Sequence, residues 1–197
     1  MSLAEKNWNP ITIHEMEAIF LQSERYRLFD LNGLPKVGPD DFFIIDNPDI
    51  SDNEQNNNRH RMLLLFRAPL LERIPRDTIW YKVRSLTDVE LEELYVIGRC
   101  GWDYDDSNQN DLKFIRDKNE LKCVSARRPN PLKNSPTNWL CPILWGHDKS
   151  GPFTIIDGNN RLTEYVSSFQ FDCLSLDIEV IIGLSSNPCY WHLLDTI

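Results

Sequence analysis

Apolar residues in the N-terminal part of the chain recur at the spacing of one helix face. Over residues 12–30 their period is that of an amphipathic α-helix. Thr12 and Glu15 form a capping-box pattern at the start of this segment, and Gly33 and Pro35 stand beyond its end. We therefore predict a helix over 12–30, with an apolar face that includes Ile13, Met16, Ile19, Phe20 and Leu28.

Three segments with other patterns follow this helix. Phe42–Ile45 is a short apolar run and predicts a strand. Asn47–Asn58 is polar, rich in Asn and without periodicity, so we expect a mobile loop there. Met62–Phe66 is a continuous apolar run that predicts a buried strand. On this pattern, residues 1–70 form an N-terminal helical extension with an Asn-rich loop.

The middle of the chain predicts a strand, a helix and a long insert. Thr78–Val83 is rich in β-branched and aromatic residues, which is typical of a strand. Thr87 and Glu90 form a second capping-box pattern, and the apolar positions after it predict a helix to about Ile97. Residues 101–138 are polar and rich in Pro and Asn, so we expect an insert rather than a regular element.

The last part of the chain predicts a hairpin, a helix and a strand. Pro142–Trp145 and Phe153–Ile156 are apolar runs joined by a turn-like polar segment. A helical pattern follows Arg161, and Leu174–Ile182 predicts a final strand. Strands and helices in this order predict a mixed α/β (α+β) domain over 71–197.

Composition narrows the class of protein. The chain has 197 residues and a hydrophobic content of 41%, both ordinary for a globular protein. It has neither an apolar run of roughly 18 residues nor an N-terminal signal pattern, so we expect a cytoplasmic protein that does not associate with membranes. The five cysteines include no Cys-x-x-Cys pair, which favours buried free thiols over a zinc module.

Charge makes a nucleic-acid partner improbable on physical grounds. The formal net charge is −9, from 21 basic and 30 acidic residues. Neutralisation of phosphates dominates nucleic-acid affinity, and an acidic chain is poorly suited to it. The cluster of Arg59, His60, Arg61 and Arg67 is interpreted as a solvated loop face.

The most informative motif follows the second apolar run of the predicted hairpin. The strand pattern ends abruptly in Asp157-Gly158-Asn159-Asn160-Arg161, and a helical pattern begins there. A helix N-terminus offers free N–H groups and a partial positive charge to an anion, and Arg adds a fork of donors suited to phosphate. A plain turn with Asp157 as a helix cap is the alternative interpretation.

This motif resembles the ParB/sulfiredoxin-like superfamily. Members include ParB-type CTP-binding proteins, sulfiredoxins and free-serine kinases, whose kinase signature is a strand that ends in Asp-Gly-His-His-Arg. Here Asp157–Arg161 stands at that signature, and Trp139 with Pro142 resembles the start of the family's hairpin. The resemblance covers roughly 77–100 and 139–184. It implies a small mixed sheet with flanking helices.

The resemblance also implies roles for individual residues. Gly158, Asn159, Asn160 and Arg161 would contact the phosphates of ATP or another nucleotide. Arg161 would stabilise charge during phosphoryl transfer, and Asp157 would accept a proton or hold Mg²⁺. These two are the catalytic candidates.

The sequence departs from the family pattern at several positions. Asn159 stands where sulfiredoxins carry a reactive Cys, which excludes their chemistry, and Asn160 replaces a phosphate-contacting His. No acid follows the first strand of this region, and Asp88 and Glu90 are the nearest substitutes for the second carboxylate of the serine kinases. The candidate pocket is completed by Trp139 and His147.

Three functions stay open at this point. The first is an enzyme, a nucleotide-dependent phosphotransferase or NTP hydrolase that acts on a small molecule or a protein. The second is a catalytically inactive module that binds a nucleotide or phosphorylated ligand and engages a protein partner. The third is a ParB-like DNA-associated protein or nuclease, which the net charge of −9 disfavours.

Overall fold

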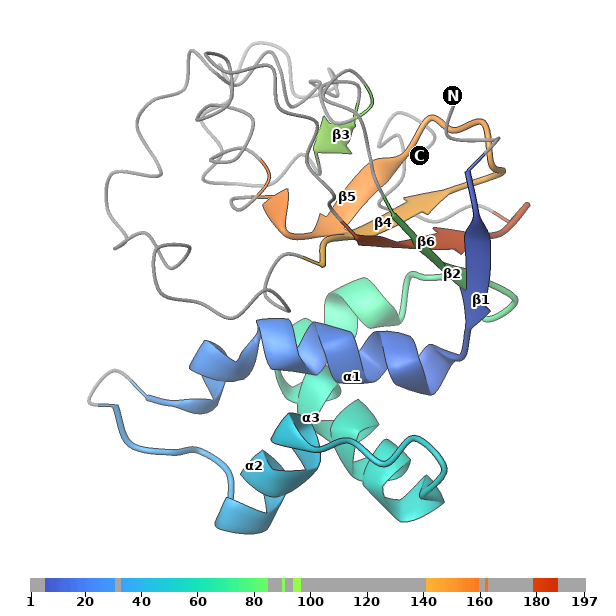
Figure 1. The fold of residues 1–197 in the computed structure, drawn as a ribbon. Coiled ribbons are helices and arrows are strands. Elements are labelled where there is room, and N and C mark those ends of the chain that lie inside the picture. Colours follow the sequence, from blue (N-terminus) through green and yellow to red (C-terminus); the bar gives the residue numbers. More distant parts are fainter. Residues whose placement is uncertain are drawn as a thin grey trace, which may run out of the picture.

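The protein has a mixed α/β fold in which helices lie on one face of a twisted sheet (Figure 1). This computed structural model describes residues 6–30, 33–84, 90, 94–96, 141–159, 162 and 179–187. Within these residues the helices are α1 (Ile13–Ser23), the 3₁₀ helix η2 (Arg25–Leu28), α2 (Pro39–Asp46) and α3 (Asn53–Leu71). The mixed α/β class expected from the sequence is confirmed.

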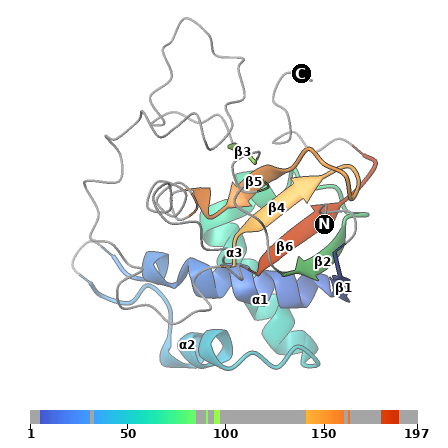
Figure 2. The same ribbon diagram turned by 45° about the horizontal axis from the view of Figure 1, so that its top comes forward.

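The sheet has six strands within the described residues. They are β1 (Trp8–Ile11), β2 (Ile79–Val83), β3 (Tyr95–Val96), β4 (Ile143–Gly146), β5 (Thr154–Asp157) and β6 (Val180–Leu184). Their order across the sheet is β1-β2-β6-β4-β5-β3, which Figure 2 shows from edge to edge. The β4–β6 and β3–β5 pairs are parallel, and the other three pairs are antiparallel. The edge strand β1 therefore brings the N-terminal region into the same sheet as the hairpin.

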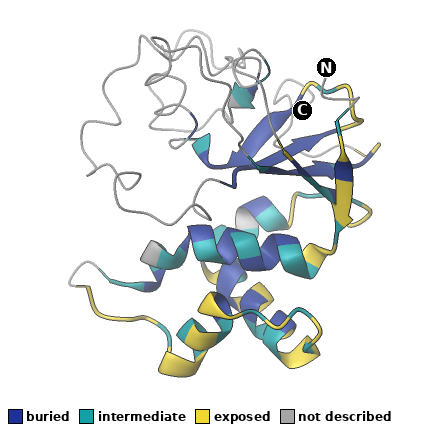
Figure 3. Cartoon of the chain, viewed as in Figure 1, coloured by how far each residue is buried: buried dark blue, intermediate teal, exposed yellow. Residues whose placement is uncertain are grey.

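The central strands are buried on both faces (Figure 3). Because side chains alternate along a strand, Ile143 and Trp145 of β4 face the helices while Leu144 faces the other side. The helical side of the core includes Met16, Phe20, Leu21, Leu63, Trp80 and Ile181. The other side includes Trp8, Val83, Phe153, Ile155, Val180 and Ile182. This double burial explains why β4 and β6 are continuous apolar runs.

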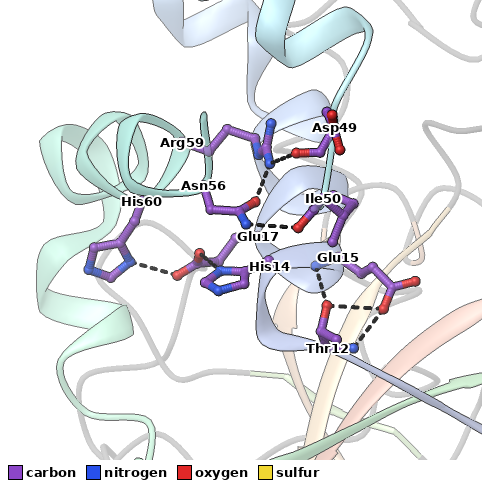
Figure 4. Close-up of polar contacts among 9 residues, drawn as sticks. All are labelled: Thr12, His14, Glu15, Glu17, Asp49, Ile50, Asn56, Arg59 and His60. Carbon is purple, nitrogen blue, oxygen red and sulfur yellow. Dashed lines mark hydrogen bonds and ion pairs between the residues drawn. The ribbon is translucent and has the colours of Figure 1, made fainter. Parts of the chain in front are cut away.

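A partly buried polar layer joins α1 to α3 (Figure 4). Glu17 of α1 is 3% exposed, and its carboxylate lies 2.6 Å from Nδ1 of His60 and 3.7 Å from Nδ1 of His14. On the same side of α3, Asn56 donates to the carbonyl of Ile50 at 2.8 Å. Arg59, 1% exposed, donates to backbone carbonyls of α2 and of the segment that follows it.

Several elements expected from the sequence are confirmed. Thr12 caps α1, and Thr12 and Glu15 form the predicted capping box. The strand expected over Thr78–Val83 is β2. The predicted hairpin is β4–β5, and the last strand, expected over Leu174–Ile182, is found as β6 at Val180–Leu184.

Three expectations for the N-terminal region are wrong. Phe42–Ile45 is no strand but the middle of α2, which begins with Pro39 and with the Gly38 N–H donating to Asp41. Asn47–Asn58 is a loop only in its first part. Asp52 caps α3, and the Asn-rich residues after it form the first turns of that helix. Met62–Phe66 continues that helix. A short apolar run fits a strand or a helix equally well, because it is too short to show a period. The helix caps therefore determined the secondary structure of these segments.

Two further helices end earlier than expected. The helix predicted over 12–30 ends as α1 at Ser23 and continues as a 3₁₀ turn, η2. The helix predicted to about Ile97 has ended by Tyr95–Val96, which is β3 and pairs with β5 in parallel. Tyr and Val favour strands, and the open edge of β5 supplies the hydrogen bonds.

Other expectations fall outside the described residues. They concern the start of the second capping box at Thr87, the insert at 101–138, the helix after Arg161, and four of the five cysteines. The fifth cysteine, Cys141, is buried. Among the helices of the described residues, none is both long and apolar enough to cross a membrane. The division of the chain at residue 70 stays a prediction.

Candidate functional site

The end of β5 passes directly into a helical turn. The backbone of Gly158 has φ of +94°, a conformation that costs a side chain strain and that Gly adopts freely. The N–H of Leu162 donates to the Gly158 carbonyl at 2.8 Å, which is the i to i−4 bond of an α-helix. The Asn159 side chain donates to the carbonyl of Ile155 at 3.2 Å. The strand, the glycine turn and the start of a helix thus follow one another as the motif predicted.

A β-bulge decides which way Asp157 points. Ile143 is paired with Asp157, whereas its neighbour Leu144 is paired with Ile155, so β5 carries one extra residue at this step. Paired residues lie on the same face of a sheet, and Ile143 faces the helices. Simple alternation from Ile155 would place Ile156 on the helical side and Asp157 on the opposite side. Because of the bulge, Asp157 lies on the helical side as well.

The Asp157 carboxylate is buried against α1 and α3. Only 6% of the residue is exposed. The Ser23 hydroxyl donates to its Oδ2 at 2.9 Å, and Nη2 of Arg67 lies 3.8 Å from its Oδ1. These contacts tie the end of β5 to the last residue of α1 and to the C-terminal half of α3.

A second buried carboxylate, Glu24, lies beside Asp157. Glu24 is 2% exposed, accepts a hydrogen bond from Arg67 and pairs with Arg27. Burial raises the pKa of Glu24 above its ordinary value, and the negative charge of Asp157 raises it further, while Arg67 and Arg27 oppose both effects. We call Ser23, Glu24, Arg27, Arg67 and Asp157 the acidic-pair cluster.

The acidic-pair cluster contains one carboxyl, that of Glu24, whose pKa is raised by its surroundings. Two carboxylates compete for the guanidinium of Arg67, which also lies 5.9 Å from the centre of the Phe20 ring. A carboxyl whose pKa is raised takes up and releases a proton closer to neutral pH than an exposed one does. Carboxyl groups with a perturbed pKa are concentrated at functional sites, although structural ion pairs also produce them.

The other predicted site residues do not meet Asp157 within the described residues. Asn160, Arg161, Asp88 and Trp139 lie outside the part of the chain that the structure describes. Glu90 pairs with Lys6 at 2.5 Å. His147 lies at the opposite end of the hairpin from Asp157, with its ring against Trp145 and Nδ1 at 3.1 Å from the Ser185 carbonyl.

Sequence reasoning missed Ser23 and Glu24 and interpreted Arg67 as part of a solvated loop face. That interpretation is wrong for Arg59 and Arg67, which are buried or half-buried, and all four residues of the cluster lie on α3 rather than in a loop; His60 and Arg61 are exposed. The helix predicted over 12–30 placed Glu24 in mid-helix, so the sequence interpretation gave no signal for it. In the structure Glu24 is the C-cap of α1, a position where the helix dipole disfavours an acid and a compensating partner is expected.

The described residues fit Mg²⁺ poorly at Asp157. Ser23 donates to one carboxylate oxygen, and the positive charge of Arg67 faces the other. No group of three or more His, Cys, Asp or Glu side chains comes together as a metal site in the parts of the chain that the structure describes. Mg²⁺ thus stays a prediction from the sequence.

The comparisons with known proteins give no relative. The chain matches no family model, no curated protein and no solved structure. The ParB/sulfiredoxin-like resemblance therefore rests on the sequence alone, through the motif at Asp157–Arg161, Trp139 with Pro142 and the order of predicted elements.

Proposed function

We propose that this protein binds a phosphate group of a nucleotide at the turn that follows β5. The observation that carries the proposal is the succession of a buried strand, a glycine with φ of +94° and the first turn of a helix. In such a turn the backbone N–H groups after the glycine point away from the strand and are available to an anion. Gly158, Asn159, Asn160 and Arg161 form the proposed phosphate site.

Asp157 has a supporting part in this proposal. Its carboxylate accepts a hydrogen bond from Ser23 of α1 and faces Arg67 of α3. These contacts anchor the end of β5, where the turn begins, to the two helices. This arrangement favours a binding module over an enzyme in which Asp157 alone performs proton transfer.

The test is calorimetric titration of ATP, ADP, CTP and GTP into the protein, with and without Mg²⁺. We expect micromolar binding that Arg161→Ala abolishes and that Gly158→Val weakens by about tenfold or more. Arg76→Ala is the matched control, because Arg76 is exposed and distant in sequence from the motif. Absence of binding by every nucleotide, or equal loss in Arg76→Ala, would reduce the motif to a plain turn.

A nucleotide-dependent phosphotransferase is the second candidate, and the raised pKa of Glu24 is the observation that favours it. In such a reaction the acceptor hydroxyl oxygen bonds to the terminal phosphorus, the bond to the bridging oxygen breaks, and the hydroxyl proton passes to a carboxylate. The acidic-pair cluster supplies two carboxylates next to the turn. Glu24→Gln would then abolish turnover and retain nucleotide binding, while unchanged turnover would contradict this role.

A further inference from the structure

The helical part of the protein carries a groove that the proposed phosphate site does not use. It lies between the segment that precedes α2, the start of α2 and the middle of α3, and has a volume of about 440 Å³. Figure 3 shows exposed residues along α2 and along the segment before it. The groove is separate from the acidic-pair cluster, with which its lining has no residue in common.

The groove combines a buried floor with exposed aliphatic side chains. Met62 is 5% exposed and forms part of the floor. Leu65, one turn further along α3, lines the groove and is 72% exposed, and Leu34, which precedes Pro35 of the lining in sequence, is 62% exposed. A large apolar side chain that is mostly exposed next to a groove contributes to stability only when another surface covers it.

Two cations line the same groove. Lys36 and Arg61 are exposed, and neither forms an ion pair with a carboxylate in the part of the chain that the structure describes. The one acid of the lining, Asp41, accepts the Gly38 N–H at 2.9 Å and caps α2. In contrast, Arg25 on a neighbouring element pairs with Asp46.

We propose that this groove binds a segment of a partner protein in which aliphatic side chains alternate with Asp or Glu. The aliphatic side chains cover Leu65 and Met62, and the carboxylates pair with Lys36 and Arg61. The net charge of the chain is −9, so most of its surface repels an acidic segment. The two cations of this groove attract such a segment locally. A free anion would leave the aliphatic side chains uncovered, so the peptide fits better than phosphate.

The probe is a short fluorescein-labelled peptide in which leucine alternates with aspartate, and fluorescence anisotropy measures its binding to the full chain. We expect Arg61→Glu and Leu65→Ser each to weaken binding by about tenfold. Arg76→Glu is the matched charge control and should leave the affinity unchanged. Because all three side chains are exposed, the variants should fold, which circular dichroism checks.

Three results would overturn the proposal. The first is binding of the leucine–aspartate peptide no stronger than that of a leucine–lysine peptide. The second is equal weakening by Arg76→Glu and Arg61→Glu, which would indicate a general charge effect. The third is self-association in sedimentation experiments that Leu65→Ser abolishes, which would assign the groove to a second copy of the chain.

Discussion

Two arginines of α3 are enclosed by the fold, but their surroundings differ. Arg59 donates to neutral oxygens, the carbonyls of Ile44 and Asp49 and the side chains of Gln55 and Asn56. Arg67, two helical turns later, faces the carboxylates of Glu24 and Asp157. Burial lowers the pKa of Arg59, since most of its partners carry no charge to compensate for the lost water.

The difference separates a structural site from a candidate functional one. The oxygens that accept hydrogen bonds from Arg59 are neutral and hold α2 against α3, while the carboxylates of Asp52, Glu17 and Asp49 act on its charge without a hydrogen bond. The acidic-pair cluster around Arg67 contains Glu24, whose pKa is raised by burial, and it lies behind the turn that we propose binds phosphate. The same residue type therefore contacts neutral oxygens in one place and two carboxylates in the other.

The largest expected effect is that of Arg67→Met. Without Arg67, two buried carboxylates remain with too little compensating charge, and we expect a loss of about 3–5 kcal/mol in the free energy of unfolding. Urea denaturation measures this loss. In a Glu24→Gln background the loss should shrink, because one of the two charges is gone. Equal losses in both backgrounds would contradict the coupling between Glu24 and Arg67.

A smaller effect is expected from Arg59→Met. This change leaves backbone carbonyls without their donor, at a cost of about 1–3 kcal/mol in unfolding free energy. Hydrogen exchange should locate the change in α2 and in the first turns of α3, while the amides of β5 keep their protection. Loss of protection in β5 as well would show that the two regions are not separate.

The pH dependence of stability should distinguish the surroundings of Arg67 from those of Arg59. Because the pKa of Glu24 is raised in the folded state, the native protein binds this proton more tightly than the unfolded chain. The stabilisation that comes from the Glu24 proton is fully present below the pKa that Glu24 has in the unfolded chain. It is lost as the pH rises through the pKa that Glu24 has in the folded protein. Over that window wild type should lose stability relative to Glu24→Gln, measured by denaturation at each pH. Arg59→Met should show the same pH dependence of stability as wild type. A difference in unfolding free energy between wild type and Glu24→Gln that does not vary with pH would contradict a raised pKa at Glu24.

The smallest effect on stability is expected from Asp157→Asn. The amide keeps the shape of the side chain. The change removes the attraction to Arg67 but also the repulsion from Glu24, and the two effects offset each other. We therefore expect the free energy of unfolding to change by no more than about 1 kcal/mol. The informative readout is the pKa of Glu24, followed by carboxyl-carbon NMR. It should fall in Asp157→Asn, because the charge of Asp157 raises it. An unchanged pKa would show that the two carboxylates are independent.

Much of this protein was determined by local patterns of the sequence. The Thr12–Glu15 capping box places the start of α1, the two apolar runs form the β4–β5 hairpin, and Gly158 allows the turn after β5. Each depends on residues near one another in the chain, for which the spacing alone carries the physical information. The mixed α/β class followed from the order of such segments.

Helix caps that the apolar pattern did not reveal, together with the tertiary structure, decided the rest. α2 and α3 were misinterpreted as strands and a loop because short apolar or Asn-rich segments take the form that their caps and packing impose. The bulge between β4 and β5, visible only as a shift in pairing, turned Asp157 toward the helices. There it meets Ser23, at a sequence separation of 134, and the acidic-pair cluster forms. Burial and charge among residues so far apart have no signature in local spacing, and only the packing of helices on the sheet brings them together.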